Sequence, residues 1–483
     1  MRLIIIQKIL GLLLALFSLT LAPPVLISFF TNDGALQAFT IALGITLSLG
    51  LVLWLPVRNK KQELRLRDGF LVVVLFWTVL GLSGAIPFTL AEHPNMSFTD
   101  AFFESLSGLT TTGATVIVGI DNLPTSILYY RQQLQWLGGM GIIVLAVAIL
   151  PMLGIGGMQL YRAETPGPMK DNKLTPRITE TAKTLWFIYL GLTISCCLAF
   201  WLNGMTFFDA ICHSFATVAI GGFSTHDASI GYFDNLNIEI IAIFFMLISG
   251  INYSIHFLAW RWKSIKPYIF DSEFIAYISF MVVTALIIVS YLVFHHIYEN
   301  ADQAVREGIF HVVSIGTTTG FVTTNFQAWP SFLPLLLLLL SFSGGCAGST
   351  GGGVKVIRIL LLFKQGMREI KRLIHPNAIF PIKLGNKAIS DQVIDSVWGF
   401  FAAYIAVFTI MLLILMATGM DQVTAFSAVA ACINNLGPGL GDVSAHYGDI
   451  SDTAKWVLSI AMLLGRLEIF TLLVLLSPVF WRS

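Results

Sequence analysis

Long apolar segments alternate with short polar ones along most of this chain, and the pattern predicts a bundle of membrane-spanning helices. A helix needs about twenty predominantly apolar residues to cross the hydrocarbon core of a bilayer. Segments of that length lie near residues 9–30, 35–57, 69–90, 184–203, 236–257, 273–297, 396–419 and 454–480. Two further long segments, interrupted by glycines, lie near 132–154 and 332–363. We therefore expect ten transmembrane helices.

The first apolar segment allows two interpretations. Arg2 and Lys8 precede it, as basic residues do in a secretory signal peptide. Its length is that of a spanning helix, however, whereas the apolar region of a signal peptide has about 7–15 residues. We interpret 9–30 as the first transmembrane helix, and a cleaved signal peptide is the alternative.

Four shorter stretches are too short or too polar to cross a membrane, and they resemble one another. They lie near 98–116, 207–225, 305–324 and 422–440 and align on Gly113, Gly222, Gly320 and Gly437. The aligned sequences are DAFFESLSGLTTTGAT, DAICHSFATVAIGGFS, EGIFHVVSIGTTTGFV and TAFSAVAACINNLGPG, which begin at Asp100, Asp209, Glu307 and Thr424. The glycines are 109, 98 and 117 positions apart, so the chain contains four degenerate copies of one unit.

Each unit predicts a helix that enters the membrane halfway and returns as irregular backbone. An acidic residue or a threonine is a favourable helix start, because it caps free N–H groups. About ten helical residues rise only about 15 Å, half of the hydrocarbon core. Irregular backbone at that depth is tolerated where it lines a cavity or is buried in protein. Four such tips around one axis would offer a ring of carbonyl oxygens to a cation, as in the filter of a potassium-selective pore.

The three residues that end at each tip glycine are the predicted potassium-binding residues. Glycine suits this position because it adopts backbone angles barred to other residues. The predicted filter consists of Thr111, Thr112, Gly113, Ile220, Gly221, Gly222, Thr318, Thr319, Gly320, Asn435, Leu436 and Gly437. The fourth tip, NNLGPGLG, departs most from the threonine-rich pattern.

The predicted fold is therefore an all-α polytopic membrane protein with fourfold pseudosymmetry. It contains four membrane–pore-loop–membrane repeats after an N-terminal two-helix unit. The two-helix unit covers 1–68, and the repeats cover 69–157, 158–262, 263–375 and 376–483.

Charge placement predicts the orientation. Most of the 28 lysines and arginines lie in the segments 58–68, 155–183, 258–272 and 364–395, which the ten-helix scheme places on one side. The other side has only the basic residues Arg131, Arg306 and Lys455, with the acids Asp121, Asp227, Asp234, Asp302, Asp442 and Asp452. Because basic loops stay in the cytoplasm, both termini are predicted to be cytoplasmic.

Composition narrows the function classes. The chain is 56% hydrophobic and 11% charged, and soluble domains have about a quarter charged residues. The net charge of +1 gives no indication of nucleic-acid binding. The five cysteines show no disulfide or metal spacing, and no nucleophile–base set or carboxylate pair can be assembled. We expect a lipid-embedded protein that is not an enzyme and has no organic cofactor, with K⁺ as the transported ion.

The four filter-like tips, the ten spans and the two additional N-terminal helices resemble the bacterial Trk/Ktr/HKT potassium transporters over essentially the whole chain. The resemblance implies one permeation path, a homodimer, a location in the bacterial inner membrane and a cytosolic nucleotide-binding regulatory subunit of the TrkA type. In this family a glycine in every repeat accompanies potassium selectivity, and a serine in the first repeat accompanies sodium transport. This chain has Gly113 there.

A second glycine-rich stretch, SFSGGCAGSTGGGVK from Ser341 to Lys355, interrupts the long span of the third repeat. It lacks the Gly-Lys-Ser/Thr ending of a phosphate-binding loop. A helix break for tight packing is one interpretation, and the family resemblance favours the other, an intramembrane gate. The predicted gate residues are Gly344, Gly345, Gly348, Gly351, Gly352, Gly353, Lys355 and Arg466.

Ionisable residues within the membrane usually face a cavity and have a partner. The resemblance implies that Arg466 projects into the pore near the gate loop, and an ion pair with Glu468 is the alternative. Glu104, His213 and His311 lie nine residues before their tip glycines. We interpret these three as packing and hydrogen-bonding positions behind the filter.

A second class of protein is also compatible with the sequence. A sodium-coupled or proton-coupled secondary transporter of another cation would also have glycine-interrupted spans. Such transporters usually contain two inverted repeats, whereas the four units here run in one direction. The sequence leaves open whether flux is passive or coupled, as in symport.

Overall fold

The computed structural model describes residues 3–60, 65–141, 178–330, 332–385 and 387–481. Six helical segments of this part are long and apolar enough to cross a membrane. They are α1 (Leu3–Leu19) with α2 (Ala22–Thr31), α3 (Leu36–Trp54) with η1 (Leu55–Val57), α4 (Leu66–Leu90), α9 (Ile178–Leu202), α14 (Ser272–Phe294) and α18 (Asp391–Ala417). The second half of the predicted span 132–154 lies outside the described residues, as does most of the predicted loop 155–183.

Two predicted spans are bent rather than straight. The first is α11 (Leu236–Ser249) followed by α12 (Tyr253–Trp262), which are bent by 94°. The second is α20 (Asp452–Arg466) followed by α21 (Phe470–Leu476), which are bent by 116°. If each pair counts as one span, the described residues contain up to eight spans. Hydropathy alone cannot detect such bends, because both arms are apolar.

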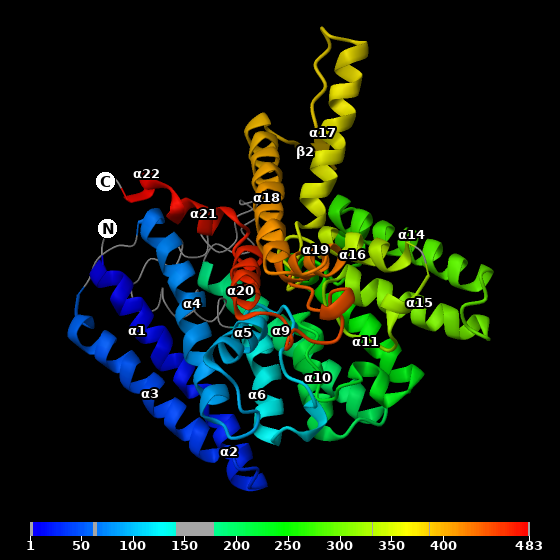
Figure 1. The fold of residues 1–483 in the computed structure, drawn as a ribbon. Coiled ribbons are helices and arrows are strands. Elements are labelled where there is room, and N and C mark those ends of the chain that lie inside the picture. Colours follow the sequence, from blue (N-terminus) through cyan, green and yellow to red (C-terminus); the bar gives the residue numbers. More distant parts are fainter. Residues whose placement is uncertain (1–2, 61–64, 142–177, 331, 386, 482–483) are drawn as a thin grey trace.

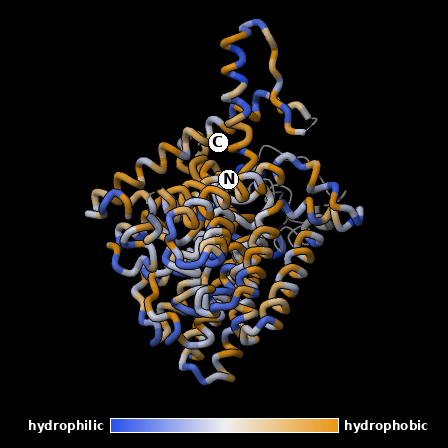
Figure 2. Tube along the Cα trace, turned by 90° about the vertical axis from the view of Figure 1, so that its right-hand side faces the viewer, coloured by the Kyte–Doolittle hydropathy of each residue, from blue (hydrophilic) through white to orange (hydrophobic). Residues whose placement is uncertain are grey.

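The predicted interruption of the segment 332–363 is confirmed, and it separates two helices. The segment consists of α16 (Leu333–Ser343), a glycine-rich loop at 344–355, and α17 (Val356–Ile374). Gly344, Gly348 and Gly353 have φ angles of 59°, 76° and 75°, which a continuous right-handed helix cannot contain. Figure 1 shows α17 projecting from the end of the bundle where both termini lie, and Figure 2 shows polar and apolar residues along it.

The predicted basic loop 364–395 is therefore partly helical. Its first third belongs to α17, and its centre forms the antiparallel pair β1 (Lys383–Leu384) and β2 (Lys387–Ala388). Several short helical turns connect the longer helices: η2 (Ile120–Asn122), η5 (Ser229–Phe233), α13 (Lys266–Ile269), η6 (Phe326–Ala328) and η7 (Gly441–Val443). The last described helix, α22 (Pro478–Trp481), follows α21.

The N-terminal helices pack through small residues. A Cβ on Gly11 of α1 would lie 2.6 Å from the backbone nitrogen of Trp54, and a Cβ on Gly50 of α3 would lie 2.6 Å from that of Ala15. The two glycines therefore allow α1 and α3 to lie in backbone contact. Figure 1 shows this pair on one flank of the bundle, beside α4.

Short helices precede all four tip glycines. They are α5 (Phe98–Leu109), α10 (Phe207–Ala219), α15 (Ala301–Gly316) and α19 (Gln422–Ile433). Asp100, Asp209 and Thr424 lie in the first turn of their helices, close to the predicted starts, but the prediction that they cap these helices is wrong. Side chains three positions earlier cap three of them: Ser97, Thr206 and Asp421. The third helix begins further upstream, so Glu307 lies within it.

Candidate functional site

The four glycine tips meet in a closed cycle, although they are far apart in the sequence. Each tip glycine faces the carbonyl oxygen of the residue that precedes the next tip glycine. The pairs, with the distance from a Cβ built on the glycine to that oxygen, are Gly113 with Gly221 (2.1 Å), Gly222 with Thr319 (1.9 Å), Gly320 with Leu436 (2.2 Å) and Gly437 with Thr112 (2.6 Å). No real Cβ approaches an oxygen so closely, so a side chain at any tip would displace its neighbour. We call the carbonyl oxygens of Thr112, Gly221, Thr319 and Leu436 the ring oxygens.

The backbone repeats the same conformation in every tip. Each tip glycine has a positive φ, between 78° and 96°, and so does the residue two positions before it. Those earlier residues are Thr111 (55°), Ile220 (55°), Thr318 (69°) and Asn435 (53°). Non-glycine residues rarely adopt this conformation, which clusters at functional sites. The recurrence in four segments of different sequence indicates a common geometric requirement.

Hydrogen bonds turn the backbone donors of the tips toward the helices. The N–H of each ring-oxygen residue donates to a helix carbonyl five positions earlier, at 2.8 Å in all four repeats. The pairs are Thr112 to Ser107, Gly221 to Ala216, Thr319 to Ser314 and Leu436 to Ala431. These four N–H groups are satisfied by the helix ends. The cycle is therefore lined by oxygens, to which a cation can bind.

Glu104, His213 and His311 are buried and hydrogen-bonded, as predicted. Each links its short helix to the segment that follows the tip glycine. The Glu104 carboxylate accepts from Thr115 Oγ1 and Val116 N at 3.0 Å. His213 Nε2 lies 2.9 Å from Ser224 Oγ, and His311 Nε2 lies 3.2 Å from Thr324 O. In the fourth repeat Ser427 Oγ makes a comparable bond to Leu440 O, at 3.0 Å.

The glycine-rich loop at 344–355 lies against the tips, next to the ends of the short helices. It contacts three of the four repeats. Thr350 Oγ1 donates to Val218 O (3.0 Å), Gly352 N to Thr318 Oγ1 (2.7 Å) and Gly353 N to Asn434 O (2.9 Å). Gly352 is in backbone contact with the fourth tip, because a Cβ there would lie 2.0 Å from Asn434 O.

Two anchors hold the loop in this position. The Lys355 ammonium donates to Gly351 O within the loop. Glu273 of α14 accepts from Ala347 N at 2.7 Å and from Ile357 N at 3.2 Å, so one carboxylate oxygen joins the first part of the loop to the first turn of α17. The remaining predicted loop glycine, Gly345, packs beside the Gly250 carbonyl, 3.1 Å from a Cβ built on it.

Arg466 completes the contacts beneath the tips. It lies at the end of α20, where the span bends, rather than in the middle of a straight helix. Its Nη1 is 3.3 Å from Thr111 Oγ1 in the first tip and 3.4 Å from Thr350 O in the loop. The loop and Arg466 together therefore contact all four repeats. The positive charge of the Arg466 guanidinium therefore lies close to oxygens that could bind a cation.

Two backbone carbonyls fix the guanidinium of Arg466 on the side away from the loop contact. Nη2 donates to Gly138 O, and to Gly139 O at 2.6 Å, within the π-helical segment η3 (Leu137–Gly141). The ion pair considered as the alternative for Arg466 is made by another arginine, because Glu468 pairs with Arg358 of α17. Lys355, Arg358 and Arg466 thus form a cationic cluster with Glu468.

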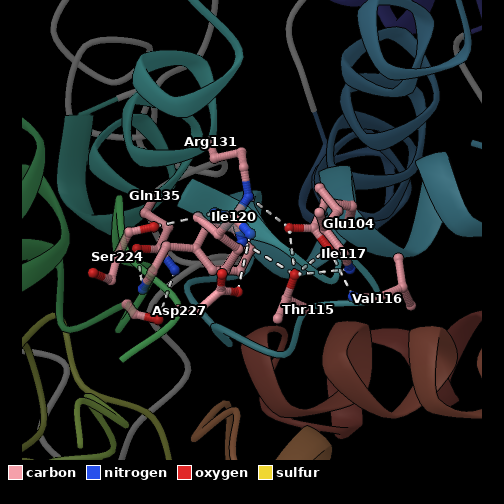
Figure 3. Close-up of polar contacts among 11 residues, drawn as sticks. Glu104, Thr115, Val116, Ile117, Ile120, Arg131, Gln135, Ser224 and Asp227 are labelled. Carbon is pink, nitrogen blue, oxygen red and sulfur yellow. Dashed lines mark hydrogen bonds and ion pairs between the residues drawn. The ribbon is translucent and has the colours of Figure 1, made fainter. Parts of the chain in front are cut away.

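Two important side chains of the site were missed by sequence analysis. Arg131 and Gln135 lie four residues apart on α6 (Thr125–Trp136) and are both 0% exposed. Arg131 was predicted only as one of the basic residues of the outer side, and its burial within α6 was not predicted. Its Nε is 2.8 Å from Glu104 Oε1, and its Nη1 donates to Ser224 O at 3.2 Å (Figure 3). The polar run YYRQQLQW within an apolar segment was the available signal.

We expect Arg131→Met to destabilise the protein strongly, because it leaves the Glu104 carboxylate buried without its cation. Breaking a buried pair costs about 3–5 kcal/mol, whereas replacing both partners costs much less. The thermal unfolding midpoint in detergent should therefore fall more for Arg131→Met than for the double variant with Glu104→Gln. Equal midpoints would show that the ion pair with Arg131 does not offset the cost of burying the Glu104 carboxylate.

Acidic side chains join the segments that follow the first and second tips. Asp227 Oδ1 accepts from Ile120 N at 2.9 Å, and His226 Nδ1 lies 2.6 Å from Asp121 Oδ1. Partial burial acts to raise the pKa of Asp121, but hydrogen bonds from His226 and Asp227 outweigh it and lower this pKa. The link is therefore complete at neutral pH and weakens as the pH falls through the lowered pKa.

A bundle of apolar helices in which four short helices end at a cycle of backbone oxygens has the features of a membrane cation transport protein. The family model TrkH, described as a cation transport protein, matches residues 35–482. The chain belongs to the TrkH family.

The most informative relatives match over almost their whole length. The Trk system potassium uptake protein TrkH of Vibrio parahaemolyticus is 61% identical over 480 residues, which is 99% of both chains. The protein of the same name from Escherichia coli K12 is 58% identical over 99% of both chains, and the E. coli protein TrkG is 43% identical over 99% of both. The crystal structure of the potassium transporter TrkH from V. parahaemolyticus aligns over 100% of both chains, with a TM-score of 0.91 and 58% identity.

Proposed function

We propose that this chain carries potassium ions into the cell across the bacterial inner membrane, through the cycle of four glycine tips. The observation that carries the proposal is the closed set of four contacts between tip glycines and ring oxygens. Carbonyl oxygens can replace the hydration shell of K⁺, and their number and field strength favour K⁺ over Na⁺. The named relatives are potassium uptake proteins, which agrees with this reading.

The proposed filter consists of the three residues ending at each tip glycine, in four repeats related by fourfold pseudosymmetry. Thr111, Ile220, Thr318 and Asn435 form the lower layer, and the ring oxygens and the tip glycines form the layers above. The four short helices end at the tips, and their partial negative charges add to the attraction for a cation. A side chain on any tip glycine would enter the space of a ring oxygen.

The proposed gate is the loop at 344–355 with Arg466. Its support is that these elements contact all four repeats at or next to the tips and place a fixed positive charge beside them. Six glycines of the loop have no side chain to pack, so its movement would mainly break the bonds of Thr350 and Lys355 and the backbone contacts of Gly352 and Gly353. The Glu273 carboxylate would remain bound to Ala347 and to the first turn of α17.

Ion uptake by cells that lack other potassium systems tests the proposed function. Expression of this chain should restore growth at low K⁺ and accelerate uptake of K⁺ and Rb⁺ far more than uptake of Na⁺. Dependence of the uptake on Na⁺ or on a proton gradient would identify coupled symport. Equal uptake of Na⁺ and K⁺ would refute the potassium filter.

We further propose that the protein is a homodimer whose cytoplasmic face binds a nucleotide-binding regulatory subunit of the TrkA type. The relatives are named as parts of a Trk system, and the projecting helix α17 carries the basic residues Lys364, Lys371 and Arg372. Both termini lie on the side of α17, which we propose is cytoplasmic. Purification from native membranes should recover two copies of this chain with such a subunit, and recovery of the chain alone would count against the partner.

A further inference from the structure

Gln135 bonds directly to one of the four ring oxygens. Its Nε2 donates to Gly221 O at 2.6 Å, and its Oε1 accepts from Phe223 N at 3.1 Å (Figure 3). The second bond fixes the orientation of the amide, because only its oxygen can accept from a backbone N–H. The amide NH₂ group therefore points at Gly221.

Gln135 also stands next to the first tip. Its Nε2 would be 3.7 Å from a Cβ built on Gly113, so the amide lies where the first and second tips meet. Arg131, one helical turn earlier, stacks over the Phe223 ring at 4.2 Å and donates to Ser224 O. Helix α6 thus holds residues 221–224 in place, and Gln135 has little freedom to turn away.

The other ring oxygens are in a different electrostatic environment. Among the hydrogen bonds of the described residues, no side chain donates to the carbonyl oxygen of Thr112, Thr319 or Leu436. The cycle is symmetric in its backbone, but one of its four oxygens already accepts a donor. An amide dipole that points at an oxygen reduces the attraction of that oxygen for a cation.

We propose that Gln135 is a specificity-determining residue that weakens the field of the Gly221 oxygen and so favours large cations. This inference rests on the proposed function. Strong-field oxygens favour small cations, because the attraction repays their high cost of dehydration. Weak-field oxygens favour K⁺ and Rb⁺, which lose their water more readily. Removing the donor should therefore shift preference toward Na⁺ and Li⁺.

Two variants test the direction of this shift. Gln135→Met removes the amide with little change in volume. Gln135→Leu removes the amide with a branched side chain of similar size. We expect either variant to raise the Na⁺/K⁺ permeability ratio about fivefold, the factor that corresponds to one hydrogen bond of about 1 kcal/mol. Permeabilities to Rb⁺ and Cs⁺ relative to K⁺ should fall in the same measurements on purified protein in bilayers.

Gln133 provides the matched control. It lies on the same helix, is 5% exposed, and donates to a backbone carbonyl, Thr20 O, at 2.8 Å. Gln133→Met should leave all permeability ratios unchanged.

The outcomes separate the inference from the proposed function. Unchanged ratios in a folded Gln135 variant, with a potassium-selective parent, would overturn the inference alone. A rise for Na⁺, Rb⁺ and Cs⁺ together would mean a loosened cycle and would also overturn it. A parent without preference for K⁺ would overturn the proposed function itself.

Discussion

Gly113→Ser is expected to abolish most of the preference for K⁺ over Na⁺. The new Cβ would lie 2.1 Å from the Gly221 oxygen, far inside van der Waals contact, so this ring oxygen or the first tip must move. The φ angle of 81° adds strain of about 1–2 kcal/mol for any side chain. Displacing one of four oxygens should lower the K⁺/Na⁺ permeability ratio by roughly tenfold or more, a difference of about 1.4 kcal/mol.

Gly119→Ser is the matched control for backbone strain. Gly119 has a similar φ of 75°, but a Cβ there meets only the Asn122 amide nitrogen, at 3.7 Å. This variant should show the same strain without displacing a ring oxygen, and its ion preference should match the parent. If both variants lost selectivity equally, strain rather than the contact with the second tip would be responsible.

Arg466→Gln is expected to increase potassium flux in the absence of any regulatory subunit. A fixed positive charge about 5 Å from a permeating ion, at an effective dielectric constant of about 20, opposes that ion by roughly 3 kcal/mol. This energy corresponds to more than a hundredfold in local occupancy. Water near the ion would reduce the effect, so we expect flux to rise at least about tenfold while the K⁺/Na⁺ ratio stays near that of the parent.

Arg466→Lys distinguishes charge from geometry. Lysine keeps the positive charge but cannot reproduce the forked contacts of the guanidinium with Gly138 and Gly139. If the charge closes the path, this variant should conduct as little as the parent. Fast flux through Arg466→Lys would assign the closure to the hydrogen bonds. No gain in well-folded Arg466→Gln would place the gate elsewhere.

The sequence was sufficient to find the tips because each repeat keeps a glycine where the backbone must turn left-handed. Gly113, Gly222, Gly320 and Gly437 all have positive φ and all face a neighbouring oxygen. The aligned position two residues earlier varies among threonine, isoleucine and asparagine. Its shared positive φ could not be read from residue types, because it comes from the surrounding packing.

The helix ends and bends were less predictable. Acidic residues in the first turn suggested helix starts at Asp100 and Asp209, but the capping side chains are Ser97 and Thr206, three residues earlier. Both members of each pair favour a helix N-terminus, so composition alone could not separate them. The sharp bend after Arg466 lies between two apolar helices and leaves no signal in hydropathy.

The partners of buried charges were the least predictable feature. Arg131 and Glu104 are 27 positions apart, and Arg358 and Glu468 are 110 apart. Spacing along the sequence predicts contacts between residues within one helix or strand. These ion pairs join different helices, so they depend on how the helices pack against one another. Arg131 was therefore placed on the outer side without a partner, although it bonds to both Glu104 and Ser224.

The central claim is that a cycle of four carbonyl oxygens selects potassium, and a reversal potential tests it most directly. Purified protein in a planar bilayer would separate equal concentrations of K⁺ and Na⁺, with Arg466→Gln used to obtain sufficient current. We predict a reversal potential far from zero, with the K⁺ side negative, and little change when Rb⁺ replaces K⁺. A reversal potential near zero would show that Na⁺ passes as easily as K⁺ and would contradict the account.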